Sequence, residues 1–276
     1  MTATAEAPPL QRERRFLLLA LTAMAVAGWA VVIWQAATMD GTHDHSMGMG
    51  MDMGRGMEMG GIDLTMGMAA PLFLAMWVAM MVGMMFPASA PMILAFERSQ
   101  SRKRADGAEL IPTWVFVAPY LAVWFLFGLL GYLAALLFEE LASGSVWAAD
   151  NISRVAGCFL VAAGIYQLTP LKRVCLSRCR SPLSFMLSYW RDGRWGAVNM
   201  GLRHGVYCLG CCWALFLLLF PIGVMNVAAM AAVAALVFAE KALPWGERAA
   251  LVAAGVMVVY GLLAIAVPDV LPTSVA

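Results

Sequence analysis

The sequence predicts an all-α fold, a polytopic membrane bundle of about seven transmembrane helices. The 276-residue chain is 62% hydrophobic and only 13% charged, whereas soluble domains are about 45–50% apolar and about 25% charged. Several segments also approach the roughly 20 apolar residues that a helix needs to cross a bilayer. This composition excludes an ordinary soluble enzyme, a disordered chain and a secreted disulfide scaffold. The net charge of +1 gives no indication of a nucleic-acid partner.

The predicted spans, in chain order, are residues 16–34, 69–94, 114–138, 152–169, 204–222, 226–239 and 249–267. The sixth is short and follows the fifth through Pro221, Gly223 and Asn226, so these two form a tight hairpin or a re-entrant pair. The first span has the basic flank of a signal peptide. Its length and its interfacial Trp29 and Trp34 favour a retained anchor.

The basic residues predict the orientation, because Lys and Arg collect on the cytoplasmic side of a membrane. With the N-terminus inside, 16 of the 18 Lys and Arg residues lie in the inner segments, and only Arg55 and Arg154 lie outside. We therefore expect a cytoplasmic N-terminus and a periplasmic C-terminus. The expected organisation is a cytoplasmic segment 1–15, an anchor 16–34, a periplasmic Met/His-rich loop 39–68 and a metal-binding membrane domain 69–267.

The loop between the first two spans holds nine of the 22 methionines, and its glycines alternate with them. Such a segment is not expected to pack as a helix or strand. Thioether sulfur selects Cu(I), and imidazole binds copper or zinc. The loop therefore predicts metal capture, and a low-complexity linker without function is the alternative. The candidate ligands are His43, His45, Met47, Met49, Met51 and Met53.

The second span carries a stripe of methionines, formed by Met76, Met80, Met81, Met84 and Met85. Residues four apart share a helix face, so the stripe can pass Cu(I) from one thioether set to the next. The alternative is packing, since methionine fills irregular gaps well. Pro87 and Pro91 are expected to break or kink this helix near its inner end.

Five of the six cysteines form two clusters at the predicted cytoplasmic side. In the first, Cys175 and Cys179 lie four residues apart on a helical turn between two prolines. In the second, at the mouth of the fifth span, helical spacing places four residues on one face: His204, Cys208, Cys211 and Cys212. The sixth cysteine, Cys158, lies alone and is given no role.

These thiols and the imidazole are sufficient for a tetrahedral zinc site or a Cu(I) site of two or three ligands. A reducing cytoplasm disfavours disulfides as the alternative. Nearby cations are expected to favour the thiolates, and those around the first cluster are Lys172, Arg173, Arg178 and Arg180. Glu240 is expected to be the counter-charge of its neighbour Lys241.

Several blocks within residues 69–245 carry a family resemblance. They are Met76-Trp77-Val78-Ala79-Met80-Met81, Gly164-Ile165-Tyr166-Gln167-Leu168-Thr169-Pro170-Leu171-Lys172 with Cys175 and Cys179-Arg180-Ser181-Pro182, and Cys208 with Gly210-Cys211-Cys212-Trp213. The sequence resembles a bacterial family known as predicted metal-binding integral membrane proteins, domain of unknown function 2182. The resemblance implies metal binding in a bacterial inner (cytoplasmic) membrane, and no established reaction.

Three functions remain open at this stage. The first is copper handling, as an importer or a metalloenzyme-assembly factor, with Cu(I) passing from the loop along the methionine stripe to the inner cysteines. The second is a membrane thiol-disulfide oxidoreductase, and the third is a structural subunit with a zinc staple. No phosphate-binding loop is present, which argues against ATP-driven pumping. The sequence indicates no catalytic residue, and the expected partners are the bilayer, a metal ion and a periplasmic copper carrier or membrane metalloenzyme.

Overall fold

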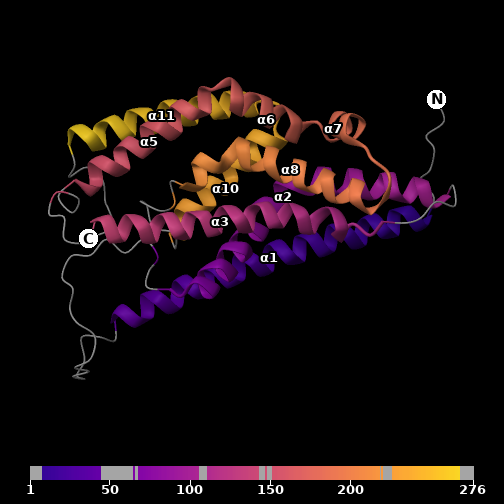
Figure 1. The fold of residues 1–276 in the computed structure, drawn as a ribbon, viewed down its shortest axis with the longest axis horizontal. Helices are drawn as coiled ribbons and strands as arrows, with labels where there is room; N and C mark the ends of the chain where they lie inside the picture. The colour runs from indigo at the N-terminus through magenta and orange to yellow at the C-terminus, as the bar shows by residue number, and fades with distance from the viewer. Residues whose placement is uncertain are drawn as a thin grey trace.

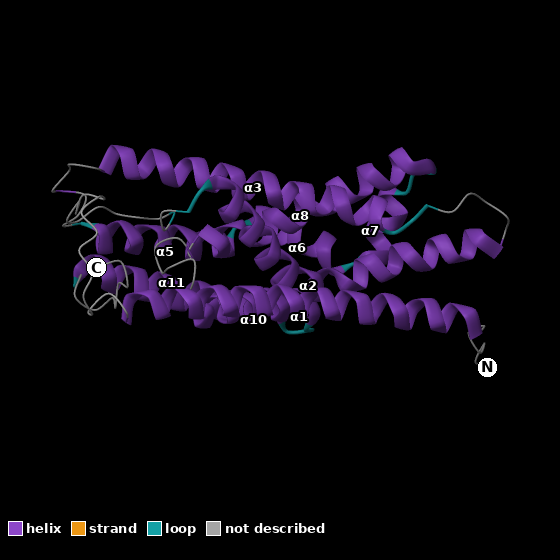
Figure 2. Cartoon of the chain, turned by 90° about the horizontal axis from the view of Figure 1, so that it is seen from below, coloured by secondary structure: helices purple, strands orange, loops and turns teal. Residues whose placement is uncertain are grey.

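The computed structural model describes residues 8–44, 65, 68–105, 111–142, 147, 151–217, 219 and 226–267. All the regular secondary structure in these residues is helical, which confirms the all-α prediction. The helices run roughly along one long axis (Figures 1 and 2). Their bounds are α1 (Pro8–Asp44), α2 (Ala70–Ala105), α3 (Trp114–Ala142), α5 (Ile152–Leu168), α6 (Pro170–Arg180), α7 (Pro182–Tyr189), α8 (Gly193–Leu217), α10 (Val227–Ala242) and α11 (Gly246–Ala266).

Four segments in the described part of the chain are long and apolar enough to cross a membrane: Arg14–Ala37, Ala70–Ser101, Trp114–Leu141 and Gly246–Ala266. The pair α5 and α6, bent by 63°, is a fifth candidate if both helices belong to one span. Of the seven predicted spans, the structure therefore supports four or five as long and apolar enough to cross a membrane. The two remaining predicted spans coincide with α8, which carries Arg194 and Arg203, and with α10, which has only 16 residues.

Glycines allow two helix pairs to pack closely. A Cβ atom at Gly28 of α1 would lie 2.6 Å from the Ala79 carbonyl oxygen of α2, and one at Gly157 of α5 would lie 2.8 Å from the Gly261 carbonyl oxygen of α11. Membrane helices commonly approach each other through small residues in this way. The pairs α1–α2 and α5–α11 therefore form two sides of the molecule, and α8 and α10 lie between them (Figure 1).

We expected a break or a kink at Pro87 and Pro91, and α2 is not broken there, since the helix continues through both prolines to Ala105. Each proline removes one backbone N–H from the helix, but packing on both sides of the prolines keeps the helix continuous. Met85 and Phe86 are buried before them, and Met92 is buried between them and the end of the helix. The hydroxyl of Ser89, between the two prolines, lies 2.9 Å from the Tyr120 hydroxyl of α3.

Helix α6 begins and ends where the sequence predicts. Thr169 caps its N-terminus, with the side-chain oxygen accepting a hydrogen bond from the Lys172 backbone N–H. Pro170 occupies the first turn, where a missing N–H costs nothing, and Pro182 begins α7. The short α6 helix packs against α8 and α10, and so it brings the two cysteine clusters close together.

Candidate functional site

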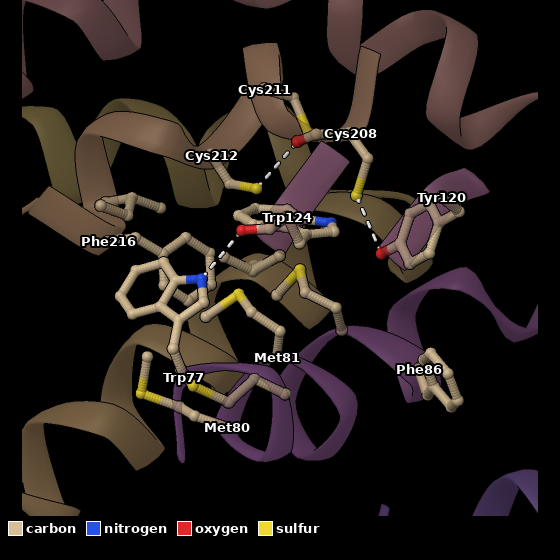
Figure 3. Packing of buried hydrophobic residues seen from close by; sticks show 14 of the residues in the cluster. Trp77, Met80, Met81, Phe86, Tyr120, Trp124, Cys208, Cys211, Cys212 and Phe216 are labelled. Carbon is tan, nitrogen blue, oxygen red and sulfur yellow. Dashed lines mark hydrogen bonds between the residues drawn. The ribbon is translucent and has the colours of Figure 1, made fainter. Parts of the chain in front are cut away.

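The site forms around Cys208, at the buried junction of α8, α3 and α10. The Lys241 ammonium group of α10 donates a hydrogen bond to the Cys208 sulfur at 3.0 Å. The Tyr120 hydroxyl lies 3.3 Å from the same sulfur (Figure 3). Cys208, Tyr120 and Lys241 are all buried. An ammonium group next to a thiol stabilises the thiolate, so this geometry favours the thiolate form of Cys208.

Three further thiols surround Cys208. The Cys179 thiol of α6 interacts with the thiols of Cys208 and Cys211. Cys211 and Cys212 each donate a hydrogen bond to the Cys208 carbonyl oxygen, at 3.0 and 2.9 Å (Figure 3). Cys211 and Cys212 are buried, and Cys179 is half-buried. The fold thus places thiols from both predicted clusters in one region.

Cys175 lies at the edge of this group. Its sulfur would be 2.7 Å from a Cβ atom at Gly210, so glycine at that position makes room for the thiol against α8. Cys175 is also close enough to Cys211 for the two thiols to interact electrostatically. Cys158 is exposed and distant from the group in sequence. All six cysteines carry free thiols.

The four cations expected near the first cysteine cluster are bonded to groups other than the thiols. Lys172 is bound to Glu240, and Arg180 donates to the Leu243 carbonyl oxygen at 2.8 Å. The other two point to backbone or surface groups: Arg173 donates to the Leu168 carbonyl oxygen and Arg178 to Ser188. In the described part of the chain, the cation bonded to a thiol is Lys241, which also lies 4.0 Å from the Met85 sulfur.

Glu240 pairs with Lys172 of α6, and the expected pairing with Lys241 is wrong. The Lys172 ammonium lies 2.8 and 2.7 Å from the two carboxylate oxygens, and both side chains are 1% exposed. Adjacent residues on a helix point in different directions. Glu240 therefore faces α6 while Lys241 faces α8, and the ion pair fixes α10 against α6.

His204 lies one helical turn before Cys208, in an aromatic environment. Its ring stacks on Tyr120 and Phe116 at centroid distances of 5.3 and 5.9 Å, and the edge of Phe185 lies 5.8 Å away. The imidazole is 2% exposed, and neither nitrogen has a hydrogen-bond partner within the described residues. Its nitrogens therefore have no protein partner among the described residues, and they form no hydrogen bond to the thiols.

The methionine stripe of α2 faces the interior. All five of its members are buried: Met76, Met80, Met81, Met84 and Met85. In the view of Figure 3, Met80 and Met81 lie beside Trp77, with the Trp124 ring between them and the thiols. The Trp77 indole donates to the Trp124 carbonyl oxygen at 3.0 Å. This burial agrees both with a copper route and with simple packing. Because Met85 contacts Lys241, the Met85 end of the stripe lies next to the thiol group.

The loop ligands lie outside the described residues. The backbone of His43 falls within α1, but its side chain is not described, and the other five follow the end of that helix: His45, Met47, Met49, Met51 and Met53. Copper capture by this loop stays a prediction.

In the described residues, no three His, Cys, Asp or Glu side chains are already arranged to hold a metal ion. The reason is visible in the hydrogen bonds: Cys208 is bonded to Lys241, while Cys211 and Cys212 point to a backbone carbonyl. A cysteine side chain reorients by rotation about one bond between staggered positions, so metal binding by these sulfurs requires them to leave their present hydrogen bonds. Thiolate and thioether donors suit Cu(I), which accepts fewer ligands than tetrahedral zinc.

Tyr120, Ser89 and Lys241 were not identified as part of the site from sequence. A signal was available, because polar and charged side chains within apolar helices are costly and usually functional. Tyr120 lies within an apolar helix. The first 13 residues of α10 carry no charge, and Glu240 and Lys241 follow them. Which partner each group finds depends on tertiary packing, and the sequence does not specify it.

The comparisons with known proteins agree with this chemistry. Residues 74–264 match the PpoB2 family, which is described as a copper chaperone. The match includes the thiol group and the methionine stripe and excludes the Met/His-rich loop. It supports the metal-related character of the resemblance noted from the motifs, under a different family name. No curated protein and no solved structure matches the chain. Because the matched region covers more than half of the sequence, the chain belongs to the PpoB2 copper chaperone family.

Proposed function

We propose that this protein binds Cu(I) in the membrane through the thiols of α6 and α8 and hands it on to a copper-requiring protein. The central observation is the group of buried thiols around Cys208, with Lys241 bonded to its sulfur at 3.0 Å. Soft sulfur donors select Cu(I). The site would use the thiolates of Cys208 and Cys179 as its charged ligands, with Cys211 or Cys212 as a neutral thiol in third place.

Charge balance supports a monovalent metal. Cu(I) bound by two thiolates carries one net negative charge, which a single buried ammonium group neutralises. Zinc held by four thiolates carries two negative charges and needs two cations. Lys241 is adjacent to the thiols, whereas Lys172 is already bound to Glu240. Since an uncompensated buried charge is strongly unfavourable, this arrangement favours Cu(I) over a zinc staple held by four thiolates.

The methionine stripe supplies the route in this proposal. Its five side chains are buried along α2, and Met85 lies 4.0 Å from the ammonium group that contacts Cys208. Cu(I) captured by the Met/His-rich loop would pass along neutral thioethers and end at thiolates, which bind it more tightly. Neutral donors suit this path because an exposed cation is costly in hydrocarbon. The protein would act in the inner membrane, with its N-terminus in the cytoplasm and its C-terminus in the periplasm.

Metal titration of the purified, reduced protein tests the proposal. We expect one Cu(I) per chain in competition with a Cu(I) chelator, and little zinc at equal concentration. Cys208→Ser and Cys179→Ser should each remove most of the bound copper, because thiolate ligands act as a set. Cys175→Ser should have a smaller effect, and Cys158→Ser is the matched control. Full copper binding by both Cys208→Ser and Cys179→Ser would reject the shared site.

A further inference from the structure

A groove of about 800 Å³ opens between α1, α2 and α7, and none of the thiol-site residues lines it. Its wall is apolar and includes Leu94 of α2 with Leu183, Met186 and Leu187 of α7. Leu183 and Leu187 are 73% and 78% exposed, so α7 presents an apolar surface that the rest of the described chain does not cover.

Two arginines from different helices border this apolar wall. Arg14 of α1 and Arg98 of α2 both line the groove, and the lining includes no acidic residue. Neither guanidinium forms a hydrogen bond or ion pair with another residue in the described part of the chain. The nearest carboxylate along α2, Glu97, is buried and accepts a hydrogen bond from Ser101. The groove thus combines two arginine side chains, with no acidic residue in its lining, and an apolar floor.

The arginines lie at the ends of two candidate membrane spans. Arg14 is the first residue of the span Arg14–Ala37, and Arg98 lies three residues before the end of the span Ala70–Ser101. Both belong to the lining of one groove, so these two ends face the same side of the membrane. That is the depth of lipid headgroups, where basic pockets between membrane helices bind anionic lipids.

We propose that this groove binds one anionic phospholipid of the cytoplasmic leaflet. Its phosphate lies at Arg14 and Arg98, whose guanidinium groups match phosphate oxygens in geometry and charge. One acyl chain lies along Leu94, Leu183 and Leu187. The bound lipid fills the space between α2 and α7 and fastens the short helix to the bundle. This inference is independent of the copper chemistry.

Native mass spectrometry of the full-length protein, exchanged into a neutral detergent, tests this site. The probes are phosphatidylglycerol and phosphatidylcholine with identical acyl chains. We expect one phosphatidylglycerol to be retained in preference to phosphatidylcholine. Arg14→Gln or Arg98→Gln should each weaken its binding about fivefold, because a basic residue near the membrane surface contributes about that factor. Arg248→Gln, at another exposed arginine of the predicted cytoplasmic side, is the control and should leave binding unchanged.

Three results would overturn the proposal. Equal retention of both lipids would show that the groove holds ordinary bilayer lipid. Equal weakening by Arg248→Gln would show general attraction to a basic surface. Displacement of the lipid by sodium phosphate alone would show a site for free phosphate. Arg14→Lys and Arg98→Lys keep the charge and guard against a folding defect, and they should retain most of the binding.

Discussion

At Cys208, a buried sulfur contacts a buried ammonium group, and the chemistry of the proposed site follows from that contact. The 3.0 Å hydrogen bond from Lys241 favours thiolate, and the Tyr120 hydroxyl adds a second polar neighbour. Within the described residues no carboxylate pairs with Lys241, because the adjacent Glu240 is bound to Lys172. One cation is therefore left to balance whatever negative charge the thiolates carry.

Replacing Lys241 by methionine should weaken Cu(I) binding by a factor on the order of 100, because a negatively charged copper–dithiolate group would lose its buried counter-charge. Competition with a Cu(I) chelator measures the change. Arg173→Met, at an exposed position of α6, is the control and should bind copper as the wild type does. Unchanged affinity in Lys241→Met would show that the ammonium group does not balance the bound metal.

The Lys172–Glu240 pair gives a separate prediction on stability. Glu240→Leu should destabilise the protein by about 3–5 kcal/mol, because it leaves the Lys172 ammonium buried and unpaired. The double variant Lys172→Met with Glu240→Leu should recover most of that loss, since apolar side chains can replace a buried ion pair. Thermal unfolding in detergent measures both. A double variant as unstable as the single one would contradict the inferred interaction.

At the scale of the element, the positions of the long apolar helices are largely predictable from sequence, whereas their continuity and their packing partners are not. Apolar length identifies α2, α3 and α11, and Thr169, Pro170 and Pro182 indicate the bounds of α6. Those signals are local in sequence. The continuity of α2 through two prolines depends on packing against other helices, so the local signal does not decide whether the helix breaks there.

The candidate site shows the same division. Helical spacing correctly places Cys208, Cys211 and Cys212 on one continuous helix. The approach of Cys179 to that helix follows from no local pattern, because it depends on the packing of α6 against α8. The roles of Lys241 and Tyr120 were missed because they depend on contacts across 33 and 88 residues of sequence separation.

The methionine stripe of α2 can be tested without disturbing the fold. Met80→Leu and Met84→Leu remove the sulfur and conserve volume, so each should cost less than about 1.5 kcal/mol in packing. Copper transfer into proteoliposomes should fall sharply, whereas copper loaded directly onto the purified protein should remain bound at the thiols. Met230→Leu, at a buried methionine of α10, is the matched control. Transfer at the wild-type rate in both stripe variants would leave packing as their role.

At the scale of the whole molecule, the proposal separates metal capture from metal binding. Deleting residues 43–59 should leave the bundle inserted, because this segment contributes none of the candidate spans. Copper delivery in cells should fall at low external copper and recover when copper is abundant, since the loop raises the local metal concentration and is not the final site. An equal defect at every copper concentration would indicate that the loop has a structural role.

The central claim is that Cu(I) binds to sulfur at the junction of α6, α8 and α10. X-ray absorption at the copper edge of the loaded protein, after removal of residues 43–59, tests it most directly. We predict one Cu(I) per chain with two or three sulfur neighbours and no oxygen, and loss of that spectrum in Cys208→Ser. A shell dominated by nitrogen or oxygen, or a sulfur shell that Cys208→Ser leaves intact, would contradict the account.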